Sequence, residues 1–140
     1  MFKVNESVGY QLGMISRKTG GRFIQLMKEN NIKFGFGGWI VLSRLWEEDG
    51  LNQQEISDRS NVAKPNISNY IDKLEKEDYI VRVVDENDRR NYKIYLTSKG
   101  KKDKELCQKL AVQSSEETLS VLTEEEKKTF ITLLKKMHKG

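Results

Sequence analysis

The chain has 140 residues, and its 25 lysines and arginines against 21 aspartates and glutamates leave a formal net charge of +4. Hydrophobic residues make up 36% and charged residues 33%, a polar composition that is still too apolar for a disordered chain. This length predicts one compact domain, and no apolar run approaches the roughly 18 residues of a membrane span. The first residues lack the apolar segment of a signal peptide, so we expect a cytoplasmic protein without membrane partners.

The single cysteine and the single histidine exclude several kinds of chemistry. Cys107 cannot form a disulfide within the chain, which suits a reducing compartment. His138 lies in a lysine-rich segment near residue 140, a poor setting for a catalytic base. Zinc sites need several Cys and His ligands, and no glycine pattern of a phosphate-binding loop occurs. We therefore expect no enzyme, no catalytic residue, no metal site and no cofactor.

The first predicted helix covers about residues 5–29, where apolar residues recur at steps of three and four. Four glycines weaken it, each by up to about 1 kcal/mol relative to alanine, so this helix needs a packing partner. A second helix is predicted over about 37–48 and ends at Asp49-Gly50.

Two short helices follow. Asn52 and Glu55 have the spacing of a capping box, and the helix that they open ends at Ser60-Asn61. The next helix begins near Lys64-Pro65, because proline suits the first helical turn. The residues that we expect to bury this helix pair are Ile56, Val62, Ile67, Ile71 and Leu74.

The hydrophobic period then changes from helical to alternating. Residues 79–84 and 92–96 read as strands, and the polar segment 85–91 between them predicts a β-hairpin with a long charged tip. One further helix is predicted from Thr97 or Ser98 onward, with Leu106, Leu110, Leu119 and Leu122 on its inner side. Thr123 and Glu126 form a second capping box, which opens the last helix.

A helix pair followed by a charged hairpin is typical of a winged helix-turn-helix. The predicted fold class is mainly α with a small β-hairpin wing, α+β and dimeric. The second helix of the pair would enter the major groove, where asparagine can bind adenine through two hydrogen bonds and lysine can reach a guanine edge or a phosphate. The candidate DNA-binding residues of this helix are Lys64, Pro65, Asn66, Ser68, Asn69 and Lys73.

The hairpin supplies a second candidate contact with DNA. Arg89 and Arg90 are predicted at its tip, and arginine is favoured in a narrow minor groove. Asp88 would repel phosphate, so we expect it to pair with a neighbouring arginine and to shape the tip. Residues 59–104 hold 12 basic against 8 acidic residues, which favours a basic surface there, although an ordinary solvated face remains the alternative.

Residues 88–100 resemble the D-x-R…L-T-x-x-G signature of the MarR family of regulators, here Asp88-Arg89-Arg90 followed by Leu96-Thr97-Ser98-Lys99-Gly100. Residues 74–82 resemble the end of that family's recognition helix and its first wing strand, and residues 39–42 resemble the start of its second helix. The resemblance covers nearly the whole chain in element order. It implies a homodimer joined by the first and last helices, operator binding through residues 65–73 and the wing, and release by a small effector or by oxidation.

The chain departs from the family pattern at a few positions. Asp78 stands where many members have glycine, and aspartate tolerates the left-handed backbone conformation. Gly37-Gly38 stands where a bulkier polar residue is common. Redox-sensing members carry a reactive cysteine near the N-terminus, whereas the only cysteine here is Cys107, which disfavours an oxidation sensor.

Apolar stripes near both ends of the chain independently favour a homodimer, because a small monomer cannot easily cover both of them. Packing within one chain is the alternative. We expect a single chain over 1–140, with dimerisation helices at about 1–30 and 105–140 and a DNA-binding region at about 34–100. The residues of the stripes are Val4, Val8, Leu12, Phe130, Leu133, Leu134 and Met137.

We therefore expect a repressor that binds an inverted-repeat operator in double-stranded DNA, and the resemblance implies that a small-molecule effector releases it. The alternative is a winged-helix protein-interaction module without operator binding. The effector and its pocket are unknown from the sequence. Candidates from spacing alone are Tyr10, Met14, Arg17, Trp39 and Trp46.

Overall fold

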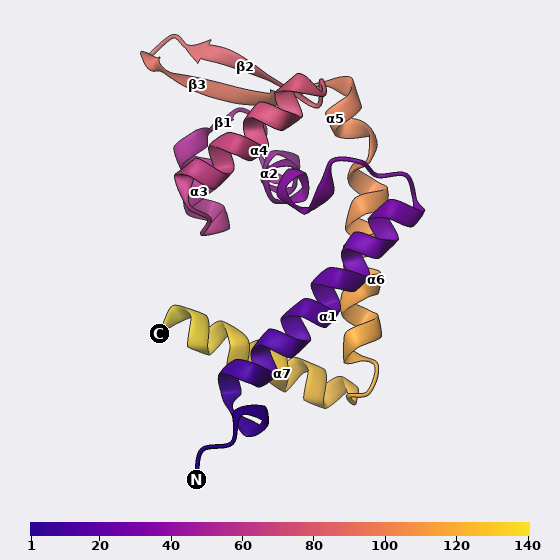
Figure 1. Cartoon of the computed structure of the whole chain (residues 1–140). Coiled ribbons are helices and arrows are strands. Elements are labelled where there is room, and N and C mark those ends of the chain that lie inside the picture. Colours follow the sequence, from indigo (N-terminus) through magenta and orange to yellow (C-terminus); the bar gives the residue numbers. More distant parts are fainter. The chain divides into compact units, whose positions relative to one another are not determined.

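The computed structural model describes all 140 residues, and Figure 1 shows the order of its helices and strands. The predicted fold class, mainly α with a small antiparallel sheet, is confirmed, and no helix combines the length and apolarity needed to cross a bilayer. The elements are a 3-10 helix Val4–Glu6, α1 Val8–Glu29, α2 Gly35–Glu47, β1 Leu51–Asn52, α3 Gln53–Ser60, α4 Lys64–Lys76, β2 Ile80–Asp85, β3 Asp88–Leu96, α5 Ser98–Lys102, α6 Lys104–Leu119 and α7 Glu124–Lys139.

Residue contacts divide the chain into two compact units. Met27–Gln108 forms one, called here the winged unit, and Met1–Leu26 together with Lys109–Gly140 forms the other, called the terminal unit.

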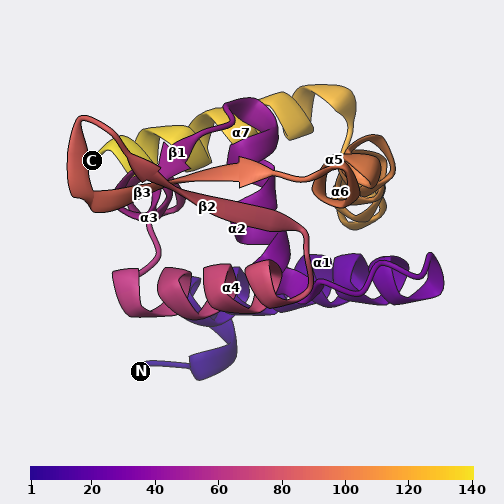
Figure 2. The same cartoon turned by 90° about the horizontal axis from the view of Figure 1, so that it is seen from above.

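The sheet of the winged unit has the strand order β1-β3-β2, and both pairs are antiparallel. The sequence analysis missed β1, where Leu51 lies opposite Ile94, because two residues are too few to show an alternating pattern. Figure 2 shows the hairpin β2–β3 running beside α4, with its turn at the same end as α3.

The prediction of a long charged tip for the hairpin is wrong. The turn consists of Glu86 and Asn87 alone, and Asp85 already pairs with Asp88. The next pair is Val84 with Tyr92, so residues 89–91 form a bulge in β3. The sequence analysis missed this part of β3, because Arg89, Arg90 and Asn91 are all polar and exposed and show no alternation.

The core of the winged unit lies where α2, α3 and α4 meet the sheet. Ile56, Ile67, Ile71 and Leu74 are buried as predicted, whereas Val62 is only half-buried because it belongs to the turn before α4. The indole Nε1 of Trp46 donates a 2.8 Å hydrogen bond to the carbonyl of Gly100.

The single helix predicted after Thr97 is in fact two helices. α5 ends at Lys102, α6 begins at Lys104, and Leu122 lies beyond α6. The Trp46 indole donates to the carbonyl of Gly100. In an unbroken helix this carbonyl would instead accept a hydrogen bond from the backbone N–H of Lys104. This tertiary hydrogen bond accompanies a break that the periodicity of the leucines does not reveal.

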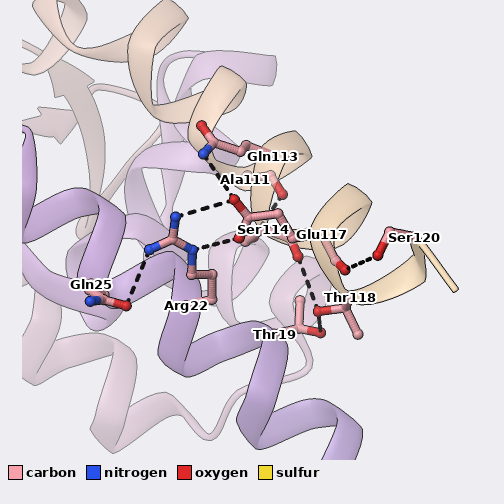
Figure 3. A network of polar contacts seen from close by, with 9 residues as sticks. All are labelled: Thr19, Arg22, Gln25, Ala111, Gln113, Ser114, Glu117, Thr118 and Ser120. Atoms are coloured by element: carbon pink, nitrogen blue, oxygen red, sulfur yellow. Dashed lines mark hydrogen bonds and ion pairs between the residues drawn. The ribbon is translucent and has the colours of Figure 1, made fainter.

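Polar contacts join α1 to α6 in the terminal unit, as Figure 3 shows. The Arg22 guanidinium binds the Glu117 carboxylate through Nε at 2.5 Å and Nη2 at 3.2 Å, and Thr19 donates to Thr118 at 2.8 Å. The hydrogen bond from Arg22, followed by one from Gln113, holds the pKa of Glu117 below its ordinary value. These bonds fix the pairing of two helices that come from opposite ends of the sequence.

Replacing Gly100 with alanine tests the close packing at α5. The new methyl group would overlap the Tyr79 carbonyl oxygen, so we expect the free energy of unfolding to fall by about 1–3 kcal/mol. Gly21→Ala is the matched control, because its methyl group enters open space on α1 and should raise stability by about 0.5–1 kcal/mol. Urea unfolding followed by circular dichroism, at one protein concentration, measures both changes. Equal stability of the two variants would contradict the close approach.

Candidate nucleic-acid interface

The turn between α3 and α4 sets the direction of α4 relative to α3. Asn61 takes the left-handed conformation with φ of 52°, and the Ser57 hydroxyl donates a 2.6 Å hydrogen bond to the Val62 carbonyl. Asn52 and Glu55 form the predicted capping box at the start of α3, and Pro65 lies in the first turn of α4. At the start of α3 the Gln53 amide donates a 3.3 Å hydrogen bond to the carbonyl of Lys64, so the starts of α3 and α4 lie side by side.

One side of α4 is buried and the other faces solvent. The buried side consists of Ile67, Ile71 and Leu74, which are spaced four and three residues apart. Of the six predicted DNA-binding residues of this helix, Ser68 is half-buried and the others are exposed: Lys64, Pro65, Asn66, Asn69 and Lys73.

Arg82 is a residue of this surface that the sequence analysis missed. From β2 its guanidinium donates to Asp72 and to Glu75 on α4, each at 2.5 Å, so it joins the first wing strand to the helix. Partial burial lowers the pKa of Arg82, but its hydrogen bonds to the two carboxylates outweigh this and raise the pKa above the ordinary value. The three-residue spacing of Asp72 and Glu75, which puts both on one side of a helix, was the available signal.

Arg89 and Arg90 lie in the bulge of β3 next to the turn, and both are exposed. Asp88 accepts from the backbone N–H of Arg90 at 3.2 Å and from its Nε at 3.1 Å, and it also accepts from the Asn91 amide at 3.2 Å. The side-chain hydrogen bond from Arg90 and then its backbone hydrogen bond lower the pKa of Asp88. The carboxylate thus pairs with the arginine beside it.

The effector candidates belong to two different units of the chain. Trp46 is 7% exposed and bound to Gly100, so it belongs to the core, and the Trp39 ring lies 6.0 Å from it. Tyr10, Met14 and Arg17 lie on α1 in the terminal unit. No group of three or more His, Cys, Asp or Glu side chains is arranged to hold a metal ion.

Comparison with known proteins agrees with this architecture. A sequence model described as the MarR family matches residues 38–92. YybA, an HTH-type transcriptional regulator of Bacillus subtilis (strain 168), is 30% identical over 130 residues, which cover 93% of this chain and 85% of that protein.

Two solved structures resemble the whole chain. A MarR transcriptional regulator from Methanosarcina mazei Go1 has a TM-score of 0.84 and 30% identity and covers 94% of each chain. A MarR protein from Peptoclostridium difficile has a TM-score of 0.88 and 30% identity, over 99% of this chain and 90% of the other.

The matched segment 38–92 contains α3, α4 and most of the hairpin, which are the parts of a winged helix-turn-helix. The relatives named above are transcriptional regulators, which are not a class of enzyme. The chain belongs to the MarR family of transcriptional regulators and carries its DNA-binding winged helix.

Proposed function

We propose that this protein is a cytoplasmic repressor that binds an inverted-repeat operator in double-stranded DNA as a homodimer and is released by a small effector. The observation that carries this proposal is the exposed polar side of α4 beside an arginine-bearing hairpin. The protein bound at its operator would then block access of other DNA-binding proteins to that site.

The two elements have different tasks in this proposal. Asn66 and Asn69 extend from the solvent side of α4 into the major groove, where their amides bind adenine, while Lys73 supplies positive charge. Arg89 and Arg90 insert into the adjoining minor groove, where the negative potential is concentrated. Asp88 acts on DNA only through Arg90, whose direction its carboxylate controls.

Exposed apolar side chains of the terminal unit support the homodimer. Val8 is 70% exposed, Leu133 is 51% exposed and Met137 is 59% exposed, although each lies on an amphipathic helix. An open cavity of about 310 Å³ between α1, α6 and α7 is lined mostly by apolar side chains such as Leu12, Phe130 and Ile131. A second copy would cover these surfaces, and a two-fold axis would present two α4 helices to an inverted repeat.

Release by oxidation finds no support at Cys107. This side chain is fully buried, and its burial, followed by the charge of Asp103, raises the pKa of the thiol to about 12. Oxidants react with thiolates, and a thiol with this pKa stays protonated at neutral pH. A small effector is therefore the favoured releasing signal, and it can act only by binding one arrangement of the reading helices more tightly than another.

Binding to DNA distinguishes the repressor from a winged-helix module that contacts a protein. We expect Asn69→Ala and Arg90→Ala each to weaken binding to a duplex selected from a random pool, by about 1–3 kcal/mol, because each removes a contact with bases or a groove. Gel-shift titration measures this loss. Gln108→Ala and Lys135→Ala, at exposed positions on α6 and α7, should bind like the wild type. If Asn69→Ala and Arg90→Ala also do so, the DNA-reading assignment is wrong.

A charge placed on α1 tests the dimer. Analytical ultracentrifugation should find the wild type at the mass of two 16.3 kDa chains and Val8→Glu shifted toward one, because a buried unpaired carboxylate opposes association. Val83→Glu is the control, since this valine is 48% exposed but lies on β2. A wild-type monomer, or the same mass for both variants, would refute this interface.

The thiol of Cys107 should be inert in the folded protein. At pH 8 we expect no reaction with Ellman's reagent until denaturant unfolds the chain, whereupon one thiol reacts. The neutral buried thiol contributes its full stability below the unfolded pKa of roughly 8.5, and this contribution is lost as pH rises toward 12. Rapid labelling of the native protein would contradict the burial and reopen the oxidation hypothesis.

A further inference from the structure

A small polar cleft lies between the start of α4 and the wing. It has a volume of about 150 Å³ and lies where the starts of α3 and α4 face the two hairpin strands. Gln53 closes one wall by donating from its amide to the Lys64 carbonyl at 3.3 Å. The residues that line this inter-groove cleft are Asn52, Gln53, Gln54, Lys64, Arg82, Arg90, Asn91, Tyr92 and Ile94.

The charges around this cleft have one sign. Lys64, Arg82 and Arg90 bring three cations to its walls, and no carboxylate lines it. Arg82 and Arg90 are held by carboxylates outside the cleft, whereas the Lys64 ammonium has no ion pair. The Tyr92 side chain, 49% exposed, brings the one hydroxyl, and the amides add neutral donors. Such a lining suits an anion that is small and accepts hydrogen bonds.

The position of the cleft identifies that anion if α4 and the hairpin occupy adjoining grooves of DNA, so the inference rests on the proposed function. A major and a minor groove that adjoin are separated by one sugar-phosphate strand. A protein that inserts one element into each groove must let this strand pass between the two elements. The inter-groove cleft is the hollow between the start of α4 and the wing.

We propose that the inter-groove cleft holds one phosphate of the backbone strand that separates the two grooves, with Lys64 and Tyr92 as its direct donors. The ammonium of Lys64 supplies the charge, and the hydroxyl of Tyr92 donates a hydrogen bond. Lys64 then sets the register of α4 along the duplex and does not read a base, since phosphate contacts position a protein without carrying sequence information.

The test combines protein variants with operators that carry one neutral methylphosphonate at a time. Lys64→Gln should weaken operator binding about tenfold, equally for all base sequences, and lower the salt dependence by about one counterion per half-site. Tyr92→Phe keeps the ring and should weaken binding about threefold to tenfold. Lys76→Gln, an exposed lysine at the opposite end of α4, is the matched control and should leave affinity and base preference unchanged.

The decisive result is a coupling at one phosphate. At a single position between the major-groove and minor-groove footprints, the methylphosphonate should weaken the wild type and abolish the further loss caused by Lys64→Gln. If the wild type binds its operator but the loss caused by Lys64→Gln is the same at every methylphosphonate position, or changes base preference, the phosphate site is wrong and the proposed function stands. If the wild type binds no duplex, the proposed function fails and this inference fails with it.

Discussion

The burial of one side of α4 is the constraint on which the winged unit depends. Ile67, Ile71 and Leu74 are each less than 2% exposed, and burying a side chain of this size contributes about 1.5–3 kcal/mol. Rotation of the helix about its axis would expose them, so the opposite side has to face solvent. The orientation of Asn66 and Asn69 is thus a consequence of hydrophobic burial and needs no contact of their own.

Acidic residues lie close to this surface, and three of them have a basic partner. Asp72 and Glu75 share the guanidinium of Arg82, which is 22% exposed, and Asp88 pairs with Arg90. The carboxylates of these pairs are at least 36% exposed, so we assign the pairs little net stability. They matter for position and local charge, because Arg82 joins β2 to α4 and reduces the repulsion that two free carboxylates would exert on a phosphate strand.

Much of the winged unit could be predicted because its signals are local. Asn52 and Glu55 lie within one turn of helix, Pro65 marks the first turn of α4, and Asp78 adopts a left-handed φ of 65°. Only part of the candidate site could be predicted from the sequence. The polar side of α4 follows from helical periodicity. The spacing of Asp72 and Glu75 puts two carboxylates on one side of α4, but that Arg82 binds them depends on the docking of β2 against α4.

The amino-acid order alone specified the capped helices, the buried side of α4 and a charged hairpin, since each depends on residues a few positions apart. Tertiary structure decided the features that join distant residues: Leu51 opposite Ile94, the Trp46 hydrogen bond to Gly100, and the cleft between Lys64 and Tyr92. Short-range hydrogen bonds and side-chain periodicity act within a helical turn and can be recognised in a sequence. Strand pairing, tertiary hydrogen bonds and clefts form only when folding brings distant residues together.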